Sequence, residues 1–139
     1  MTEPTQLVSE LRAAARAASR HAYAPYSSFT IGAVVRHPAG VHAGCNVENG
    51  SYGLTQCAER VALASAVSSG VAPGSFDALL IYRPGDSALP PCGACRQVML
   101  ELMAPDALVV SCCDGEHLYH WRVRDLLPDA FNMDEHGHD

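Results

Sequence analysis

Three cysteines and one glutamate are the residues of this chain whose types and spacing suggest chemistry. Cys57 stands two residues before Glu59, and Cys92 and Cys95 follow later in a Pro-Cys-Gly-Ala-Cys run. Three thiolates fill three corners of a zinc tetrahedron and leave the fourth for water, whereas structural zinc sites are normally closed by four protein ligands. A carboxylate beside that open corner can carry protons to and from the water. The pattern therefore predicts a hydrolytic zinc site with Glu59 as its proton carrier.

Two arginines adjoin these cysteines in the sequence. Arg60 follows the Cys57-Ala58-Glu59 run and Arg96 follows Cys95. Three thiolates around one Zn²⁺ leave a net charge of about −1, which weakens the pull of the metal on its water. A guanidinium that donates hydrogen bonds to a thiolate sulfur offsets part of that charge. We expect Arg60 to do so, whereas Arg96 fits this role and an ordinary surface ion pair equally well.

Two other interpretations of the cysteines stay open from the residues alone. A C-x-x-C pair at a helix start is also typical of dithiol redox proteins, although such motifs follow the first long strand and Cys92 lies two thirds of the way along the chain. Alternatively, Cys45 closes a four-cysteine structural site in a binding module. Against this, Cys45 lies in a predicted strand, where small buried thiols are common, and Cys112 and Cys113 have the same explanation.

Length, composition and charge limit what the chain can be. Its 139 residues predict one domain, and a hydrophobic fraction of 48% fits a globular protein. The net charge of −6 argues against a nucleic-acid polymer as partner, because binding a phosphate backbone needs clustered Lys and Arg. The amino terminus has no secretory pattern and no stretch reaches membrane-spanning length. We therefore expect no membrane partner and a cytoplasmic location.

Periodicity and turn residues predict an α/β fold, a mixed sheet with helices packed on it. Apolar residues at helical spacing indicate helices, a hairpin turn lies at 38–40, and the continuous apolar run 78–82 is typical of a central strand covered on both faces. The expected elements are a helix over about 6–21, a strand over 29–35, a strand from the hairpin turn through 47, a helix over about 56–69, a strand over 78–82, a helix over about 91–103, and strands over 107–113 and 117–123.

The expected helix starts would place the thiols at helix ends. Thr55 is a plausible N-cap for the second helix, and Pro91 stands at the favoured first position of the third. Cys57 and Cys92 would then lie in first helical turns. Unpaired backbone N–H groups and the helix dipole favour a thiolate there, which lowers the cost of ionising the metal ligands.

The chain resembles the homotetrameric cytidine deaminases of pyrimidine salvage almost from end to end. The resemblance rests on five blocks: residues 23–29, 44–49, 57–60, 91–97 and 126–131. It implies a three-layer α/β/α fold with a mixed sheet of about five strands. It also implies one catalytic domain over residues 1–131, followed by an acidic, histidine-bearing tail over 132–139 that we expect to be disordered.

The resemblance also implies a role for each matching residue. It makes Cys57, Cys92 and Cys95 the ligands of one Zn²⁺ per subunit and Glu59 the proton shuttle, with Arg60 beside the ligands. Asn46 and Glu48 would hold the ribose 3′-hydroxyl, Phe29 would form the aromatic wall of the base pocket, and Ala58 would be a further substrate-binding residue. Tyr52 and Phe131 would reach the site of a neighbouring subunit, so the active sites would lie at the interfaces of a homotetramer.

The implied reaction is the hydrolytic deamination of cytidine and 2′-deoxycytidine to the uridines and ammonia. The Glu48 carboxylate accepts from a sugar hydroxyl and repels a phosphate, which predicts nucleosides rather than nucleotides as substrates. Blasticidin deaminases share the zinc blocks, but the Asn-Val-Glu-Asn run at 46–49 favours cytidine. Gly50 stands where the family usually has Ala and adds backbone freedom to the loop that presents Tyr52.

Overall fold

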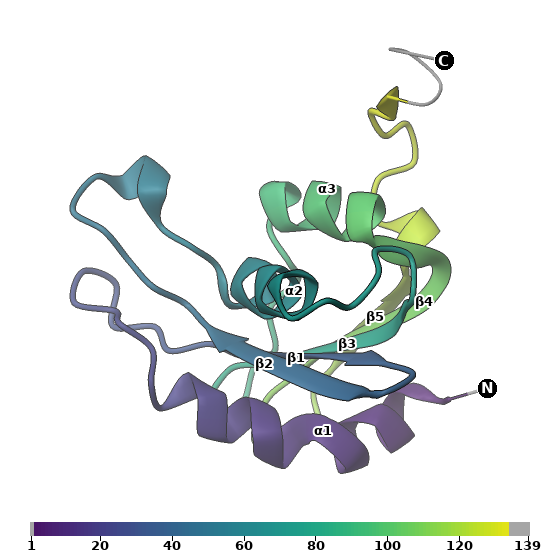
Figure 1. Cartoon of the computed structure of the whole chain (residues 1–139). Coiled ribbons are helices and arrows are strands. Elements are labelled where there is room, and N and C mark those ends of the chain that lie inside the picture. Colours follow the sequence, from purple (N-terminus) through teal and green to yellow (C-terminus); the bar gives the residue numbers. More distant parts are fainter. Residues whose placement is uncertain (1, 134–139) are drawn as a thin grey trace.

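The computed structural model describes residues 2–133, which form three layers. A five-stranded sheet has helix α1 on one face and helices α2 and α3 on the other (Figure 1). This arrangement confirms the expected α/β/α fold. The helices are α1 (Pro4–Ser19), α2 (Ala58–Ser68) and α3 (Gly93–Leu102), and the strands are β1 (Gly32–His37), β2 (Gly40–Cys45), β3 (Phe76–Tyr82), β4 (Met103–Cys112) and β5 (Tyr119–Arg122).

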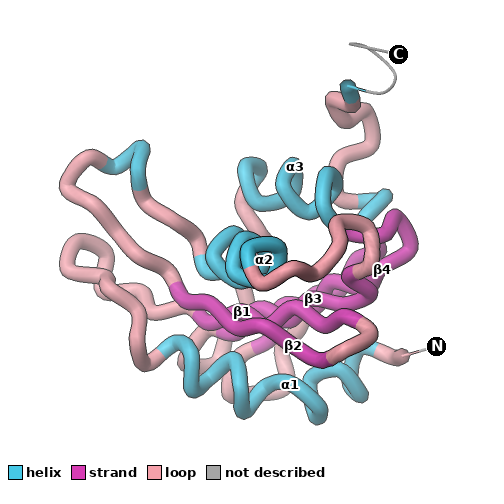
Figure 2. Tube along the Cα trace, in the orientation of Figure 1, coloured by secondary structure: helices cyan, strands magenta, loops and turns pink. Residues whose placement is uncertain are grey.

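The sheet is mixed, with strand order β2-β1-β3-β4-β5. β1 pairs antiparallel with β2 and with β3, β3 pairs parallel with β4, and β4 pairs antiparallel with β5. The parallel pair requires a crossover, and this connection contains α3, which lies over the sheet (Figure 2). The apolar run 78–82 falls in β3, which is the central strand as predicted.

Alternating side chains of β3 supply the cores on both faces of the sheet. Leu79 and Ile81 pack in the cluster that contains the apolar faces of α2 and α3, whereas Leu80 and Tyr82 pack in the cluster under α1. Successive side chains of a strand point to opposite faces. A strand covered by helices on both sides is therefore apolar at every position, which is why this segment is a continuous apolar run in the sequence.

Two glycines let helices approach the sheet closely. A Cβ on Gly32 of β1 would lie 1.8 Å from the carbonyl oxygen of Ala15 in α1. A Cβ on Gly44 of β2 would lie 2.5 Å from the backbone nitrogen of Ala62 in α2. The Gly44 contact fixes the position of α2 on the sheet, and with it the helix end that carries Cys57.

Several predicted boundaries are wrong, and two of the differences matter for the site. β2 ends at Cys45, so Asn46 and Val47 lie beyond the strand. β1 begins at Gly32 rather than at Phe29. The Asn46 side chain accepts a hydrogen bond from the Ile31 N–H at 2.9 Å and donates one to the Phe29 carbonyl at 2.7 Å. These backbone groups are therefore not available for pairing with a strand.

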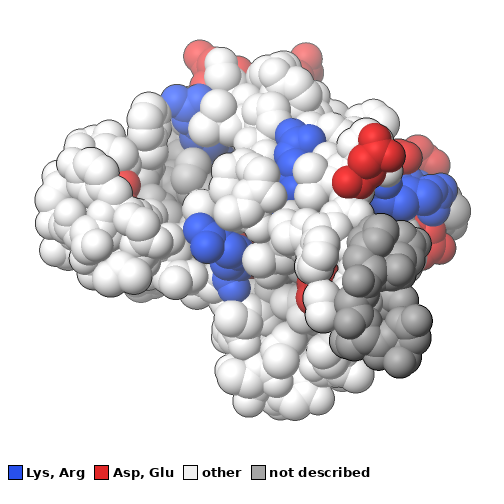
Figure 3. Space-filling view, turned by 90° about the horizontal axis from the view of Figure 1, so that it is seen from above, with Lys and Arg blue, Asp and Glu red and all other residues white. Residues whose placement is uncertain are grey.

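The ends of the chain and its surface add three observations. The predicted tail, 132–139, lies outside the described residues from 134 onward, so its disorder and the domain limit at 131 stay predictions. No helix within residues 2–133 is both long and apolar enough to cross a membrane. On the face drawn in Figure 3, Arg side chains form small separate groups rather than a continuous stripe.

Candidate metal and substrate site

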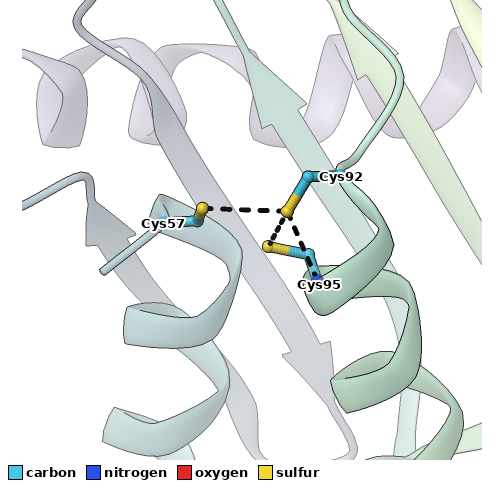
Figure 4. Close-up of side chains that lie close together, drawn as sticks. All are labelled: Cys57, Cys92 and Cys95. Carbon is cyan, nitrogen blue, oxygen red and sulfur yellow. Dashed lines mark hydrogen bonds between the residues drawn. The ribbon is translucent and has the colours of Figure 1, made fainter. Parts of the chain in front are cut away.

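The three thiols meet where α2 and α3 begin. Cys57 is the N-cap residue of α2, Cys92 is the N-cap residue of α3, and Cys95 lies in the first turn of α3. The two helices thus each start two residues later than predicted, and Pro91 precedes α3 instead of opening it. The Cys95 N–H donates to Cys92 Sγ at 3.5 Å, so one backbone donor at the start of α3 is directed at a thiol (Figure 4).

The spacing of the sulfurs fits a zinc ion. The Cys57 and Cys92 sulfurs lie 3.9 Å apart, those of Cys92 and Cys95 lie 3.4 Å apart, and all three lie within 4.8 Å of one another (Figure 4). Zinc–sulfur bonds of about 2.3 Å in a tetrahedron place two sulfurs about 3.8 Å apart. A disulfide would need about 2.05 Å. The geometry therefore matches three ligands of one metal.

Among residues 2–133, the metal group contains these three thiols and no fourth protein ligand. Within residues 2–133 it is the one group of three or more His, Cys, Asp or Glu side chains close enough to hold a metal ion. Cys45 does not belong to it, although the four-cysteine interpretation needs it there. The donor set thus leaves one tetrahedral corner for water or substrate, as a catalytic site does.

Arg60 lies against the first thiol. Its Nη2 donates to Cys57 Sγ at 3.4 Å and to the Thr55 carbonyl at 3.3 Å. The hydrogen bond from the Cys95 thiol and the Arg60 guanidinium together lower the pKa of Cys57 to about 5, despite partial burial. The same contact raises the pKa of Cys95, which keeps the shared proton while Cys57 is ionised. Cys57 is therefore prepared to bind a cation.

Glu59 is buried beside the thiols. It lies in the first turn of α2 and is only 6% exposed, yet it lines a pocket together with Cys57 and Cys92. Burial raises the pKa of this carboxyl, and the neighbouring Cys57 charge raises it further. A buried carboxyl that reaches a pocket and holds a proton readily has the properties of an acid–base group.

The pocket has a volume of about 200 Å³ and collects residues from several elements. Three of the predicted site residues line it together with the metal-binding thiols Cys57 and Cys92, namely Asn46, Ala58 and Glu59. The remaining lining residues are Ile31, Thr55, Ile81, Arg83, Leu89, Pro90 and Ser111. Cys95, the third thiol of the metal group, is fully buried and does not line the pocket.

Asn46 and Glu48 are not on a strand, contrary to our expectation. Val47, between them, bridges to Tyr23 and to Gln56, and these pairings replace the continuation of β2. The Val47 N–H donates to the Gln56 carbonyl at 2.9 Å and the return bond is 2.8 Å. Because Gln56 directly precedes Cys57, this bridge ties the segment that carries Asn46 and Glu48 to the metal ligand.

Each of the two side chains keeps hydrogen-bonding capacity for a ligand. Asn46, 8% exposed, accepts from Ile31 N–H and donates to the Phe29 carbonyl, which leaves one N–H and one lone pair. Glu48 accepts from the Ser27 hydroxyl and from the N–H groups of Tyr26 and Ser27, which lowers its pKa. Glu48 lines a neighbouring hollow that shares Thr55 with the pocket.

The three predicted aromatic residues lie outside the pocket lining. Phe29 is 52% exposed, and the Arg83 guanidinium covers its ring. Tyr52 is 74% exposed and contacts the Tyr26 ring at 5.8 Å between centroids. Phe131, 60% exposed, lines a different hollow of about 320 Å³ beside α3. Within one chain, therefore, Tyr52 and Phe131 are not brought to the thiols.

Arg96 neither contacts a thiolate nor forms a surface ion pair among the described residues, the two roles considered for it from the sequence. It donates to the Pro91 carbonyl at 2.9 Å and to the Leu126 carbonyl at 3.2 Å, and its guanidinium lies 5.7 Å from the Trp121 ring centroid. Its guanidinium thus bonds backbone carbonyls instead of a thiolate. Arg96 joins the loop before Cys92 to the carboxy-terminal segment.

Arg83 and Ser111 line the pocket, and the motifs of the sequence predicted neither of them. Ser111 lies near the carboxyl end of β4, and Arg83 directly follows β3, its parallel neighbour. Ligands of α/β proteins bind outside the carboxyl ends of parallel strands. The position of Arg83 and Ser111 at the ends of the apolar runs of β3 and β4 was therefore a sequence signal for pocket residues.

Comparison with known proteins agrees with this site. Residues 5–112 match the family model described as the cytidine and deoxycytidylate deaminase zinc-binding region. The chain belongs to this family. The resemblance inferred from the sequence and the predicted zinc cofactor are thereby confirmed.

Relatives of the deaminase family match over nearly their whole length. A cytidine deaminase from Mycobacterium tuberculosis is 43% identical over 126 residues, 90% of each chain, and one from Sporosarcina psychrophila is 39% identical over 129 residues, 92% of this chain and 93% of that protein. The crystal structure of a cytidine deaminase from Burkholderia pseudomallei matches with a TM-score of 0.84 and 47% identity, covering 94% of this chain and 100% of that chain.

Proposed function

We propose that this chain is a zinc hydrolase that deaminates cytidine and 2′-deoxycytidine to uridine and 2′-deoxyuridine with release of ammonia. The observation that carries the proposal is the buried Glu59 carboxyl in a pocket that also contains Cys57 and Cys92 of the three-thiol group. Membership of the deaminase family and the cytidine deaminases among its relatives support cytidine as the substrate.

Each residue of the metal group has a part in the proposed reaction. Cys57, Cys92 and Cys95 hold the zinc, which when bound lowers the pKa of water so that a nucleophile forms near neutral pH. Glu59 accepts the proton of the attacking water on its carboxylate and delivers it to N3 of cytosine, which makes C4 more electrophilic. Glu59 then takes a second proton, from the hydroxyl group added at C4, and passes it to the amino group, which leaves as ammonia while the C4 carbonyl forms. Arg60 stabilises the Cys57 thiolate throughout.

In the proposed complex, Asn46 and Glu48 bind the ribose of the substrate. Asn46 lines the pocket and has one N–H and one lone pair left after its two bonds, and the Glu48 carboxylate has lone pairs left after its three bonds. An anionic carboxylate accepts from the 3′-hydroxyl and repels a phosphate. We therefore expect nucleosides rather than nucleotides to react, with Phe29 and Ala58 against the base.

We further propose a homotetramer in which Tyr52 and Phe131 complete the site of a neighbouring subunit. Both aromatic rings are more than half exposed, and both lie on segments that project beyond the three layers (Figure 1). Light scattering of the purified protein tests the assembly, and a fully active monomer would contradict it. The dependence of the site on three reduced thiols supports a cytoplasmic location.

The activity is tested by the loss of ultraviolet absorbance when purified, zinc-assayed protein meets cytidine, 2′-deoxycytidine and CMP in parallel. Loss with both nucleosides but not with CMP is the expected result. No loss with any of them, despite bound zinc, would indicate a different amino-heterocycle as substrate. Protein without zinc and with a reducible Cys92–Cys95 disulfide would support the redox interpretation instead.

A further inference from the structure

We propose that Arg83 is a specificity-determining residue of the pocket. Its guanidinium holds the Phe29 ring in place and sets a positive charge at the base end of the site. The site then favours cytosine nucleosides with a neutral or anionic base substituent over those with a cationic one. This inference rests on the proposed deamination of cytidine.

The backbone of Arg83 is fixed by the sheet. Arg83 directly follows β3, and its N–H donates to the Cys112 carbonyl at the end of β4, at 3.2 Å. This bond continues the pairing of two central strands by one residue. The side chain therefore starts from a rigid position, and it lines the pocket with Cys57 and Glu59.

Arg83 also covers one face of Phe29. The guanidinium carbon lies 4.9 Å from the centroid of the Phe29 ring, within the range of a cation–π contact. The backbone of Phe29 is held by the Ser27 hydroxyl, which accepts its N–H at 3.0 Å, and by Asn46, which donates to its carbonyl. The ring is half exposed and lies outside the pocket lining, so the Arg83 contact is what joins it to the pocket, where it would border the base.

The charge of Arg83 is available to a ligand. Arg16 and Arg36 form the ion pairs found within residues 2–133, and Arg83 takes part in none of them. The acidic residue in the pocket lining, Glu59, is buried in α2, and Glu48 lines the neighbouring hollow. A cationic substrate group near Arg83 would thus be repelled, because no carboxylate forms an ion pair with this guanidinium within residues 2–133.

The C5 position of cytosine is the place to measure the effect of this charge. In the proposed reaction C4 is attacked, N3 receives a proton and N1 carries the sugar, which leaves the C5–C6 edge to face the pocket wall. Two unit charges several ångströms apart at a partly screened site change an equilibrium by roughly five- to tenfold. The ratio of kcat/KM for 5-carboxycytidine to that for 5-(aminomethyl)cytidine measures this effect, and 5-methylcytidine serves as the neutral reference.

The test compares charge variants at one position on the zinc-loaded enzyme. Arg83→Met should lower the ratio about 25- to 100-fold, because it removes both the attraction for the anionic substituent and the repulsion of the cationic one. It should raise the KM for cytidine about two- to fivefold through loss of the contact with Phe29, with kcat within about twofold. Arg83→Glu should reverse the preference, and Arg83→Lys should retain it. As a matched control, Arg16→Met removes an arginine of α1, on the opposite face of the sheet from α2 and α3, whose guanidinium lies 5.3 Å from the Tyr82 ring centroid, and it should leave the ratio unchanged.

The outcomes separate this inference from the proposed function. A ratio that stays the same in Arg83→Met and Arg83→Glu, while cytidine is still deaminated, would overturn the role of Arg83 and leave the proposed function intact. If Arg83→Glu does not fold, Arg83→Met against Arg83→Lys decides the matter. Failure of the wild-type chain to deaminate cytidine would overturn the proposed function, and with it this inference.

Discussion

Asn46→Ala tests whether one amide both builds the site and binds the ribose. The substitution removes the acceptor of the Ile31 N–H and the donor to the Phe29 carbonyl, two backbone groups that the side chain satisfies at 2.9 and 2.7 Å. A buried polar backbone group left without a partner costs about 1–3 kcal/mol, and partial access of water lowers the sum for two groups to about 2–4 kcal/mol. At roughly 4 °C per kcal/mol, the midpoint of thermal unfolding should fall by about 8–16 °C.

Two measurements on the same variant separate the two roles of Asn46. Calorimetry gives the unfolding midpoint, and kinetics at a temperature where the variant is folded should give a raised KM for cytidine. Asn49→Ala is the control for stability, since the Asn49 side chain accepts only the nearby Ser51 N–H in an exposed turn, and we expect a loss below about 1 kcal/mol. An Asn46→Ala protein as stable as the wild type would show that the two hydrogen bonds do not stabilise the fold.

Three further predictions follow from contacts away from the reaction. Gly44→Ala brings a Cβ to 2.5 Å from the Ala62 nitrogen, so it should lower the free energy of unfolding, measured by chemical denaturation, by about 1–3 kcal/mol. Gly53→Ala, which has open space around its Cβ, should leave that free energy unchanged. Equal stabilities of the two variants would contradict the close packing of α2. Hydrogen bonds from the Gly85 N–H, the Tyr82 hydroxyl and Arg16 lower the pKa of Asp114 to about 2 from 3.8, so its stabilising contribution is complete above pH 4 and is lost as the pH falls toward 2. Asp114→Asn should therefore flatten the loss of stability between pH 4 and pH 2, and an unchanged slope would argue against this network. Arg96→Met removes the hydrogen bonds to the Pro91 and Leu126 carbonyls, so it should destabilise the fold by about 2 kcal/mol and speed the loss of zinc to a chelator. An unchanged rate of zinc release would show that the loop before Cys92 does not depend on Arg96.

The sequence contained enough information to predict the layers and the metal group. Three local signals each correspond to the expected element: the helical periodicity of residues 6–21, the continuous apolar run 78–82 and the hairpin turn at 38–40. The three cysteines could be grouped because their types and the nearby Glu59 point to one chemistry. The structure then brings their sulfurs within 4.8 Å.

Long-range contacts explain what the sequence did not reveal. The end of β2 at Cys45 depends on the bridges of Val47 to Tyr23 and Gln56, and the late start of β1 depends on the Asn46 side chain. No local pattern encodes these pairings. The contacts of Arg96 likewise depend on where the carboxy-terminal segment returns to α3, which adjacency to Cys95 in the sequence cannot indicate.

Glu59 is the group that we propose moves the proton in a zinc-dependent deamination of cytidine. The most direct test is the rate of uridine formation from cytidine by wild-type and Glu59→Gln proteins of equal, measured zinc content. The glutamine is nearly isosteric and cannot accept the proton, so the rate should fall by roughly 10²-fold or more while fold and zinc are retained. Near-normal turnover by the zinc-loaded Glu59→Gln protein would contradict this role.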